Sequence, residues 1–289
     1  MNRFLFALPF LGFAFPVSAI EPIKVLIVDG QNNHDWRKTT PILKAILEEA
    51  KIFSVDVATA PAKGATPEFA AFRPKFKDYA VVVSNYNGQL WPEATRSDFA
   101  EFVDNGGGFV PVHAANNSFP EWPEYNAMIG VGGWGGRSEK SGPYVRLREG
   151  KFTRDTSKGT GGSHGAQHAF LVQIHEKDHP IVAGLPEKWL HATDELYDRL
   201  RGPAKNLTVL GTAFADKAKG GSGEAEPMLM VIEYGKGRVF HTTLGHSDVS
   251  IKCVGFRTTF ARGCEWAATG KVTQPVPADF PTAEKISSR

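Results

Sequence analysis

Three features are scarce in this sequence of 289 residues: cysteine, an excess of charge of one sign, and long apolar runs after the N-terminus. The 33 basic and 31 acidic side chains almost cancel, and no basic run with interleaved aromatics argues for nucleic acid. Beyond the first segment, no stretch is apolar over the roughly 20 residues that a membrane helix needs. A small, neutral or weakly charged ligand fits this balance better than a polyanion does.

The two cysteines, Cys253 and Cys264, allow one disulfide at most. If both lie on the final predicted helix, a rise of 1.5 Å per residue places them about 16 Å apart, whereas a bridge needs Cα atoms within about 7 Å. We therefore expect two buried free thiols, unless Cys253 lies in a loop that folds back on the helix. Neither follows a strand into a tight glycine turn, so neither is predicted to be a nucleophile.

Residues 1–19 have the pattern of a secretory signal peptide. Arg3 supplies the positive charge, 4–15 is an almost unbroken apolar run, and Val17-Ser18-Ala19 fits a cleavage site. An uncleaved membrane anchor is the alternative, but the apolar run is short for one. We expect a mature protein that works in a periplasm or outside the cell, without a membrane after cleavage.

The rest of the chain alternates apolar runs with helical patterns. Strands are predicted where apolar residues run continuously, and helices where they recur at helical spacing. A strand–helix–strand rhythm of this kind indicates an α/β fold, with a sheet that carries helices on both faces. We expect one domain over 20–272 and an extended C-terminal tail over 273–289. The predicted strands are 23–28, 53–58, 79–84, 109–112, 170–174, 208–212, 228–233 and 238–242, and the predicted helices are 41–50, 92–105 and 254–269.

The segment 105–115 predicts a strand–turn–helix elbow with His113 at its tip. Three glycines end a helix, a short apolar strand follows, and His113 precedes two alanines. Such a turn holds one side chain rigidly above the sheet, with backbone N–H groups nearby. With no cysteine or serine at that point, glutamine hydrolysis through a thioester is excluded. The alternative is that His113 only caps the following helix.

Further polar residues fall at the ends of predicted strands, where ligands of parallel sheets bind. His34, Tyr86 and His246 each follow such a strand. Asp194 and Glu195 form an adjacent acid pair, of which one at most points inward on a strand. We predict His113 and His246 as acid and base, with Asp194 or Glu195 orienting them or acting as a base. The alternative is that these groups are ordinary surface residues.

Two further sets of residues are candidates for binding. Trp122 and Trp134 follow the elbow, and their faces can stack on a sugar, although both can equally be core aromatics. Asn116, with His34 and Tyr86, is predicted to contact the substrate. A divalent metal is possible, with His113, His164 and His246 as ligands.

Four segments in order resemble one family. They are the elbow with His113, the run His-Pro-Ile-Val-Ala-Gly-Leu-Pro over 179–186, Asp-Glu-Leu-Tyr over 194–197, and Gly-Lys-Gly-Arg-Val-Phe-His-Thr-Thr-Leu-Gly-His over 235–246. Together they resemble the ThuA-like (trehalose utilisation) family. The resemblance implies a flavodoxin-like sheet of the class I glutamine amidotransferase type without its nucleophile. It also implies a role in disaccharide use, often beside oxidoreductases that make 3-keto sugars.

Two hypotheses follow. The first is an enzyme that acts on a disaccharide or 3-keto-glycoside, either by acid–base chemistry of histidines and a carboxylate or with metal assistance. The second is a non-catalytic sugar-binding module on a degenerate amidotransferase fold, because fold alone does not establish activity. Both have a small carbohydrate as partner, and the sequence leaves the oligomeric state open.

Overall fold

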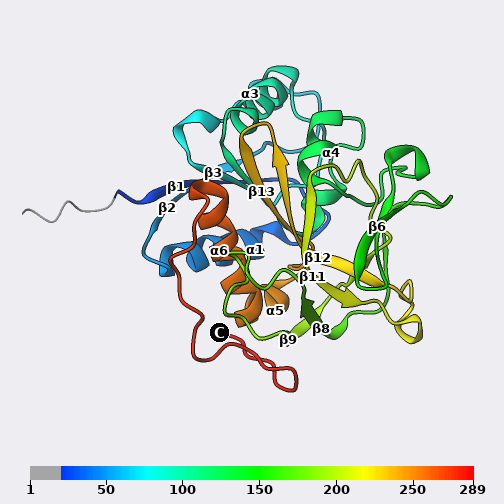
Figure 1. The fold of residues 1–289 in the computed structure, drawn as a ribbon. Coiled ribbons are helices and arrows are strands. Elements are labelled where there is room, and N and C mark those ends of the chain that lie inside the picture. Colours follow the sequence, from blue (N-terminus) through cyan, green and yellow to red (C-terminus); the bar gives the residue numbers. More distant parts are fainter. Residues whose placement is uncertain (1–20) are drawn as a thin grey trace, which may run out of the picture.

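The computed structural model describes residues 21–289, so the predicted signal peptide over 1–19 lies outside the described residues. The first half of the chain forms one side of a nine-stranded sheet (Figure 1). Its strands pair parallel in the order β2-β1-β3-β4, and the valines of β1, β3 and β4 are buried, as continuous apolar runs require. Their bounds are β1 Ile23–Asp29, β2 Phe53–Thr59, β3 Val81–Ser84 and β4 Gly108–Pro111.

The second half extends this sheet. Strand β13 pairs parallel with β4, and the remaining strands continue antiparallel in the order β12-β11-β8-β9. Two small two-stranded sheets, the hairpin of β5 with β6 and the pair of β7 with β10, lie outside it. The bounds are β5 Tyr144–Arg148, β6 Lys151–Asp155, β7 Ser163–His164, β8 His168–Ile174, β9 Lys188–Asp194, β10 Tyr197–Asp198, β11 Leu207–Phe214, β12 Ala225–Tyr234 and β13 Gly237–Thr242.

Helices cover both faces of the sheet (Figure 1). Apolar residues of α1, α5 and α6 pack into one buried cluster, and those of α2, α3 and α4 pack into a second cluster on the opposite face. This confirms the α/β fold with a mixed sheet and helices on both faces. The bounds are α1 Trp36–Glu49, α2 Pro67–Ala70, α3 Glu93–Asp104, α4 Pro123–Ile129, α5 Asp248–Ile251 and α6 Val254–Thr269.

The strand directions decide where a site can form. Counting the parallel and antiparallel pairings across the sheet, β9 runs in the same direction as β1, β4 and β13. The carboxyl ends of these four strands therefore meet at one edge of the sheet, where ligands of α/β folds bind. Strand β9, which belongs to the antiparallel half, therefore ends at the same edge of the sheet as the parallel strands.

Some predicted elements differ from the observed ones. The first helix begins at Trp36 and not at Pro41, because the side chain of Asp35 accepts a hydrogen bond from Lys38 N and caps it. Strand β9 and the hairpin β5–β6 were not predicted. After the elbow the chain forms a short 3-10 helix, His113–Asn117, in place of the expected α-helix.

The C-terminal segment is irregular and packs back on the domain. Leu190 N donates to Thr282 O, and Val254 N donates to Ser287 O, so the tail contacts the first half of β9 and the start of α6. Cys253 lies just before α6 under this segment, and Cys264 lies within the helix; both are free and buried, as predicted. In the described part of the chain, no helix is long and apolar enough to cross a membrane.

Candidate functional site

His113 sits at a strained turn directly after β4. Its backbone has φ of +47°, a left-handed conformation that is unusual for a residue with a Cβ. Its Nδ1 lies 2.7 Å from Thr243 O, and because a carbonyl only accepts, Nδ1 carries the proton. Its Nε2 is therefore available as a lone pair or, when protonated, as a donor. The elbow thus holds one imidazole above the sheet edge in a fixed orientation.

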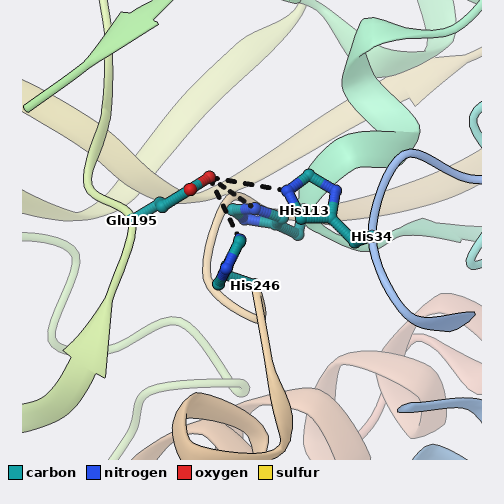
Figure 2. Close-up of side chains that lie close together, drawn as sticks. All are labelled: His34, His113, Glu195 and His246. Carbon is teal, nitrogen blue, oxygen red and sulfur yellow. Dashed lines mark ion pairs between the residues drawn. The ribbon is translucent and has the colours of Figure 1, made fainter. Parts of the chain in front are cut away.

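Three more side chains meet His113 at this edge (Figure 2). His34 comes from the loop after β1, His246 from the loop after β13, and Glu195 from the residue after β9. The carboxylate oxygen Glu195 Oε2 lies at the centre. It is 3.1 Å from His246 Nδ1, 3.5 Å from His34 Nε2 and 3.6 Å from His113 Nε2. We call these four residues the histidine–glutamate cluster.

The charges in the cluster are set by burial and by its own carboxylate. Burial raises the pKa of Glu195, but the three surrounding imidazoles outweigh burial and hold this pKa well below its usual range. The same carboxylate raises the pKa of His246, whereas burial lowers the pKa of His34. At neutral pH Glu195 is therefore ionised and His34 is neutral. The ionised carboxylate of Glu195 and the neutral ring of His34 thus face one point.

Asp194, the other half of the acid pair, turns away from the cluster. Its carboxylate is fully buried and accepts hydrogen bonds from the backbone N–H groups of Glu195, Gly245 and His246 at 2.9–3.0 Å. His191 Nε2 lies 2.9 Å from the same carboxylate. Asp194 thus ties the end of β9 to the loop after β13. It positions Glu195 and His246 through their backbone amides.

The buried pair of His191 and Asp194 predicts a pH-dependent stability. Burial disfavours a charged imidazole, but the hydrogen bond and charge of Asp194 raise the pKa of His191 to about 9. An unfolded histidine has a pKa of about 6.5, so the pair contributes stability that is fully present below pH ~6.5 and is lost as the pH rises through ~9. The loss amounts to about 3 kcal/mol.

Urea unfolding of the wild type and of His191→Gln between pH 6 and 9.5 checks this. We expect stability to fall with pH in the wild type and to change much less in His191→Gln, whose amide can still donate to Asp194. Equal slopes in the two proteins would contradict a charged His191.

A cavity of about 410 Å³ opens above the cluster. Two kinds of group line it: amides and imidazoles that can bind hydroxyls, and aromatic rings that can stack. Among its described lining residues there is no lysine or arginine, and Glu195 is the acidic one. The lining residues are Asn33, His34, Asn87, Asn117, Trp134, Gly135, His164, Glu195 and Tyr197.

Of the residues predicted to bind substrate, His34 and Trp134 line this cavity and three others do not. Tyr86 is fully buried and donates to Gln89 O, and Trp122 packs in the aromatic core beneath α3 and α4. Asn116 is fully buried too, with Nδ2 3.0 Å from His241 Nε2. These side chains are held by core contacts, so they cannot reach a ligand in the cavity.

The predicted metal ligands are placed differently as well. His113 and His246 lie in the cluster, but the third imidazole there belongs to His34. His164 lies at the rim, with Nδ1 2.8 Å from Gly165 O and Nε2 3.8 Å from Glu195 Oε1. It is the most exposed of the four imidazoles around the carboxylate, at 37% of its side chain. The set suited to a metal ion is thus His34, His113, His246 and Glu195.

Besides Gly135, four cavity residues were not predicted from the sequence. Asn33 and Asn87 lie in the loops after β1 and β3, and Asn87 Nδ2 donates to Asn33 Oδ1 at 2.6 Å. Asn117 ends the 3-10 helix after the elbow, and its buried Oδ1 has no partner among the described residues. Tyr197 packs its ring 4.1 Å from that of His113. The polar loops after the strands were the available signal for the asparagines.

The fold and the site define a class: α/β proteins with a large mixed sheet, helices on both faces and a histidine at the tip of the elbow after β4. Within that class, the chain belongs to the ThuA family, described as trehalose utilisation, whose model matches residues 24–267. The match covers most of the chain and all four residues of the cluster. No match to a curated protein was found.

Solved structures agree with this assignment. A ThuA-like protein from Parabacteroides merdae ATCC 43184 is 49% identical, with a TM-score of 0.90 over 93% of this chain and 98% of that chain. A ThuA-like protein from Bacteroides uniformis ATCC 8492 is 18% identical, with a TM-score of 0.60 over 90% and 97%. A β-galactosidase from Rahnella sp. R3 is 15% identical, with a TM-score of 0.50 over 90% of this chain and 33% of that chain. The last two likenesses concern the fold alone.

Proposed function

We propose that this protein is an enzyme that processes a small, neutral carbohydrate, a disaccharide or a 3-keto-glycoside, at the histidine–glutamate cluster. The observation that carries the proposal is the convergence of three imidazoles on one ionised carboxylate at the floor of a cavity. Groups that exchange protons near pH 7 suit reactions at a carbon beside a carbonyl group. A module that only binds sugar has little need for them.

The lining of the cavity supports a neutral sugar. The amides of Asn33, Asn87 and Asn117 can both donate to and accept from hydroxyl groups. The indole of Trp134 supplies a face for the C–H groups of a sugar ring. Phosphate sites, in contrast, are usually built with arginine or lysine, and neither lines this cavity in the described part of the chain. A phosphorylated sugar is therefore disfavoured.

Covalent amidotransferase chemistry is not part of the proposal. The elbow presents His113, and the hydroxyl group that follows it along the chain, Ser118, donates to Tyr86 O at 2.8 Å. Its side chain is buried and outside the cavity lining. On the sequence pattern of residues 1–19, we also propose that the reaction takes place in a periplasm or outside the cell.

The direct test is incubation of the mature protein with neutral disaccharides, their 3-oxo derivatives and phosphorylated counterparts, followed by NMR of the products. We expect turnover of a neutral member and none of the phosphorylated ones. Turnover of the phosphorylated set alone would contradict the proposal. Saturable binding of a sugar without conversion of any would favour the non-catalytic sugar-binding module.

Trp134→Ala is expected to weaken binding of that sugar about tenfold, because a stacking face worth about 1 kcal/mol or more is lost. The measurement is KM, or Kd by calorimetry. Phe214→Ala is the matched control, since Phe214 is 60% exposed on β11 and outside the cavity lining. An unchanged KM in Trp134→Ala would remove Trp134 from the binding surface.

A further inference from the structure

The histidine–glutamate cluster aims four ligand atoms at one point. His34, His113 and His246 each offer a ring nitrogen and Glu195 offers a carboxylate oxygen, and the four atoms lie within 4.8 Å of one another. They come from four separate segments at the carboxyl ends of strands (Figure 2). We infer that these residues bind a divalent first-row transition-metal ion, such as Zn²⁺, Mn²⁺ or Fe²⁺.

The spacing of the atoms fits such an ion. Bonds of about 2.0–2.2 Å to nitrogen and oxygen place tetrahedral ligand atoms about 3.3–3.5 Å apart. Glu195 Oε2 lies 3.1, 3.5 and 3.6 Å from the nitrogens of His246, His34 and His113. The three separations from the carboxylate oxygen are thus close to those around a small ion, and the whole set of ligand atoms lies within 4.8 Å.

Two of the four ligand atoms are buried nitrogens without a hydrogen-bond partner among the described residues. His113 Nε2 and His246 Nδ1 are buried, and neither has a hydrogen bond of acceptable geometry in the described part of the chain. Buried polar atoms almost always have a partner, so two such atoms facing one point indicate a missing ligand. A cation fits this point, because the nitrogen lone pairs of His113 and His246 and the carboxylate of Glu195 would all attract it.

The outer contacts of His113 and His34 match those of metal-binding histidines. The second nitrogen of a ligating imidazole usually donates to a carbonyl or an amide oxygen, which fixes the ring. His113 Nδ1 faces Thr243 O at 2.7 Å, and His34 Nδ1 faces Asn32 Oδ1 at 3.3 Å. Both rings therefore present Nε2 to the ion.

The donor set also selects the class of ion. Calcium and magnesium prefer shells made of oxygen, whereas imidazole suits zinc, iron, nickel and copper. Three nitrogens and one carboxylate oxygen fill a tetrahedral shell, and expansion to five-coordination would open a position on the cavity side, where His34 and Glu195 line the wall. An ion there can accept oxygen atoms from a ligand in the cavity.

One consequence rests on the proposed function, although the metal site itself does not. With three imidazoles bound to the ion, His164 remains as the free histidine of the cavity lining. Its Nε2 points towards the carboxylate, and its ring is partly exposed. A carbonyl oxygen of the sugar would be polarised by the ion, and the ring of His164 would offer a hydrogen-bonding nitrogen to the same ligand from the wall of the cavity.

The test uses the full mature chain purified without a histidine tag. We expect about one metal ion per chain by elemental analysis, a melting temperature lowered several degrees by dipicolinate and restored by Zn²⁺, and a visible absorption band when Co²⁺ replaces the ion. Chains that hold well under a tenth of an equivalent, gain no stability from Zn²⁺, Mn²⁺ or Co²⁺ and give no cobalt spectrum would overturn the inference.

Variants locate the ion. His34→Ala and His246→Ala are expected to weaken Zn²⁺ binding at least tenfold, whereas His175→Ala is a matched control, because His175 lies at the opposite edge of the sheet and contacts Thr212 Oγ1. Equal losses in all three would overturn the assignment. Metal is measured without sugar, so a protein that binds the ion but converts no carbohydrate would contradict the proposed function alone.

Discussion

Replacing Glu195 by glutamine is expected to lower turnover by a factor of about 10²–10⁴ while the fold stays intact. Glu195 Oε2 is the one atom that all three imidazoles of the cluster approach within 3.6 Å. Glutamine keeps the size of the side chain but removes the negative charge. Without that charge the cluster can neither bind a cation well nor stabilise a protonated histidine. Both metal-assisted chemistry and acid–base chemistry of the histidines would therefore fail.

The measurement is the initial rate on the converted sugar, with circular dichroism to check the fold. Glu176→Gln makes the same chemical change on an exposed residue just after β8, at the opposite edge of the sheet, and should leave the rate unchanged. A Glu195→Gln protein that keeps the wild-type rate would remove Glu195 from the reacting centre. Unchanged sugar affinity with lost turnover would separate an enzyme from a binding module.

The parallel half of the fold could be predicted from the sequence because burial on both faces leaves a continuous apolar run. The runs at 23–28 and 79–84 became β1 and β3 almost residue for residue. The helix over 254–269 was also correct, since its apolar spacing is regular and Gly270 ends it. The hairpin β5–β6 escaped prediction because most of β6 faces solvent and carries no apolar pattern.

The candidate site was harder to predict from the sequence than the fold. His34, His113 and His246 follow strands, so their meeting at one edge could be expected from the parallel topology alone. Glu195 reaches these histidines because of the direction of β9. Four antiparallel pairings across the sheet determine that direction, and no local sequence pattern indicates it. Trp122 illustrates the opposite error: aromatic residues near a loop resemble a sugar platform, yet this ring packs among other core aromatics.

Asp194→Asn is expected to destabilise the protein by about 3–5 kcal/mol, because it breaks a buried network of charge-assisted hydrogen bonds. Each oxygen of Asp194 accepts two hydrogen bonds: Oδ1 from the amides of Glu195 and His246, and Oδ2 from Gly245 N and His191. An asparagine retains one oxygen and directs an NH₂ group at donors that have no other acceptor nearby. Urea unfolding at pH 6, where His191 is charged, measures the loss.

Two controls make the result specific to this network. Asp178→Asn removes a carboxylate from an exposed loop and should change stability by less than about 0.5 kcal/mol. Glu195→Gln alters the neighbouring residue, whose side chain anchors no backbone amide, and should cost much less than Asp194→Asn. If Asp194→Asn proved as stable as these controls, its carboxylate would not be what joins β9 to the loop after β13. The cluster would then owe its geometry to His113 and the elbow, and Glu195 and His246 would be free to move apart.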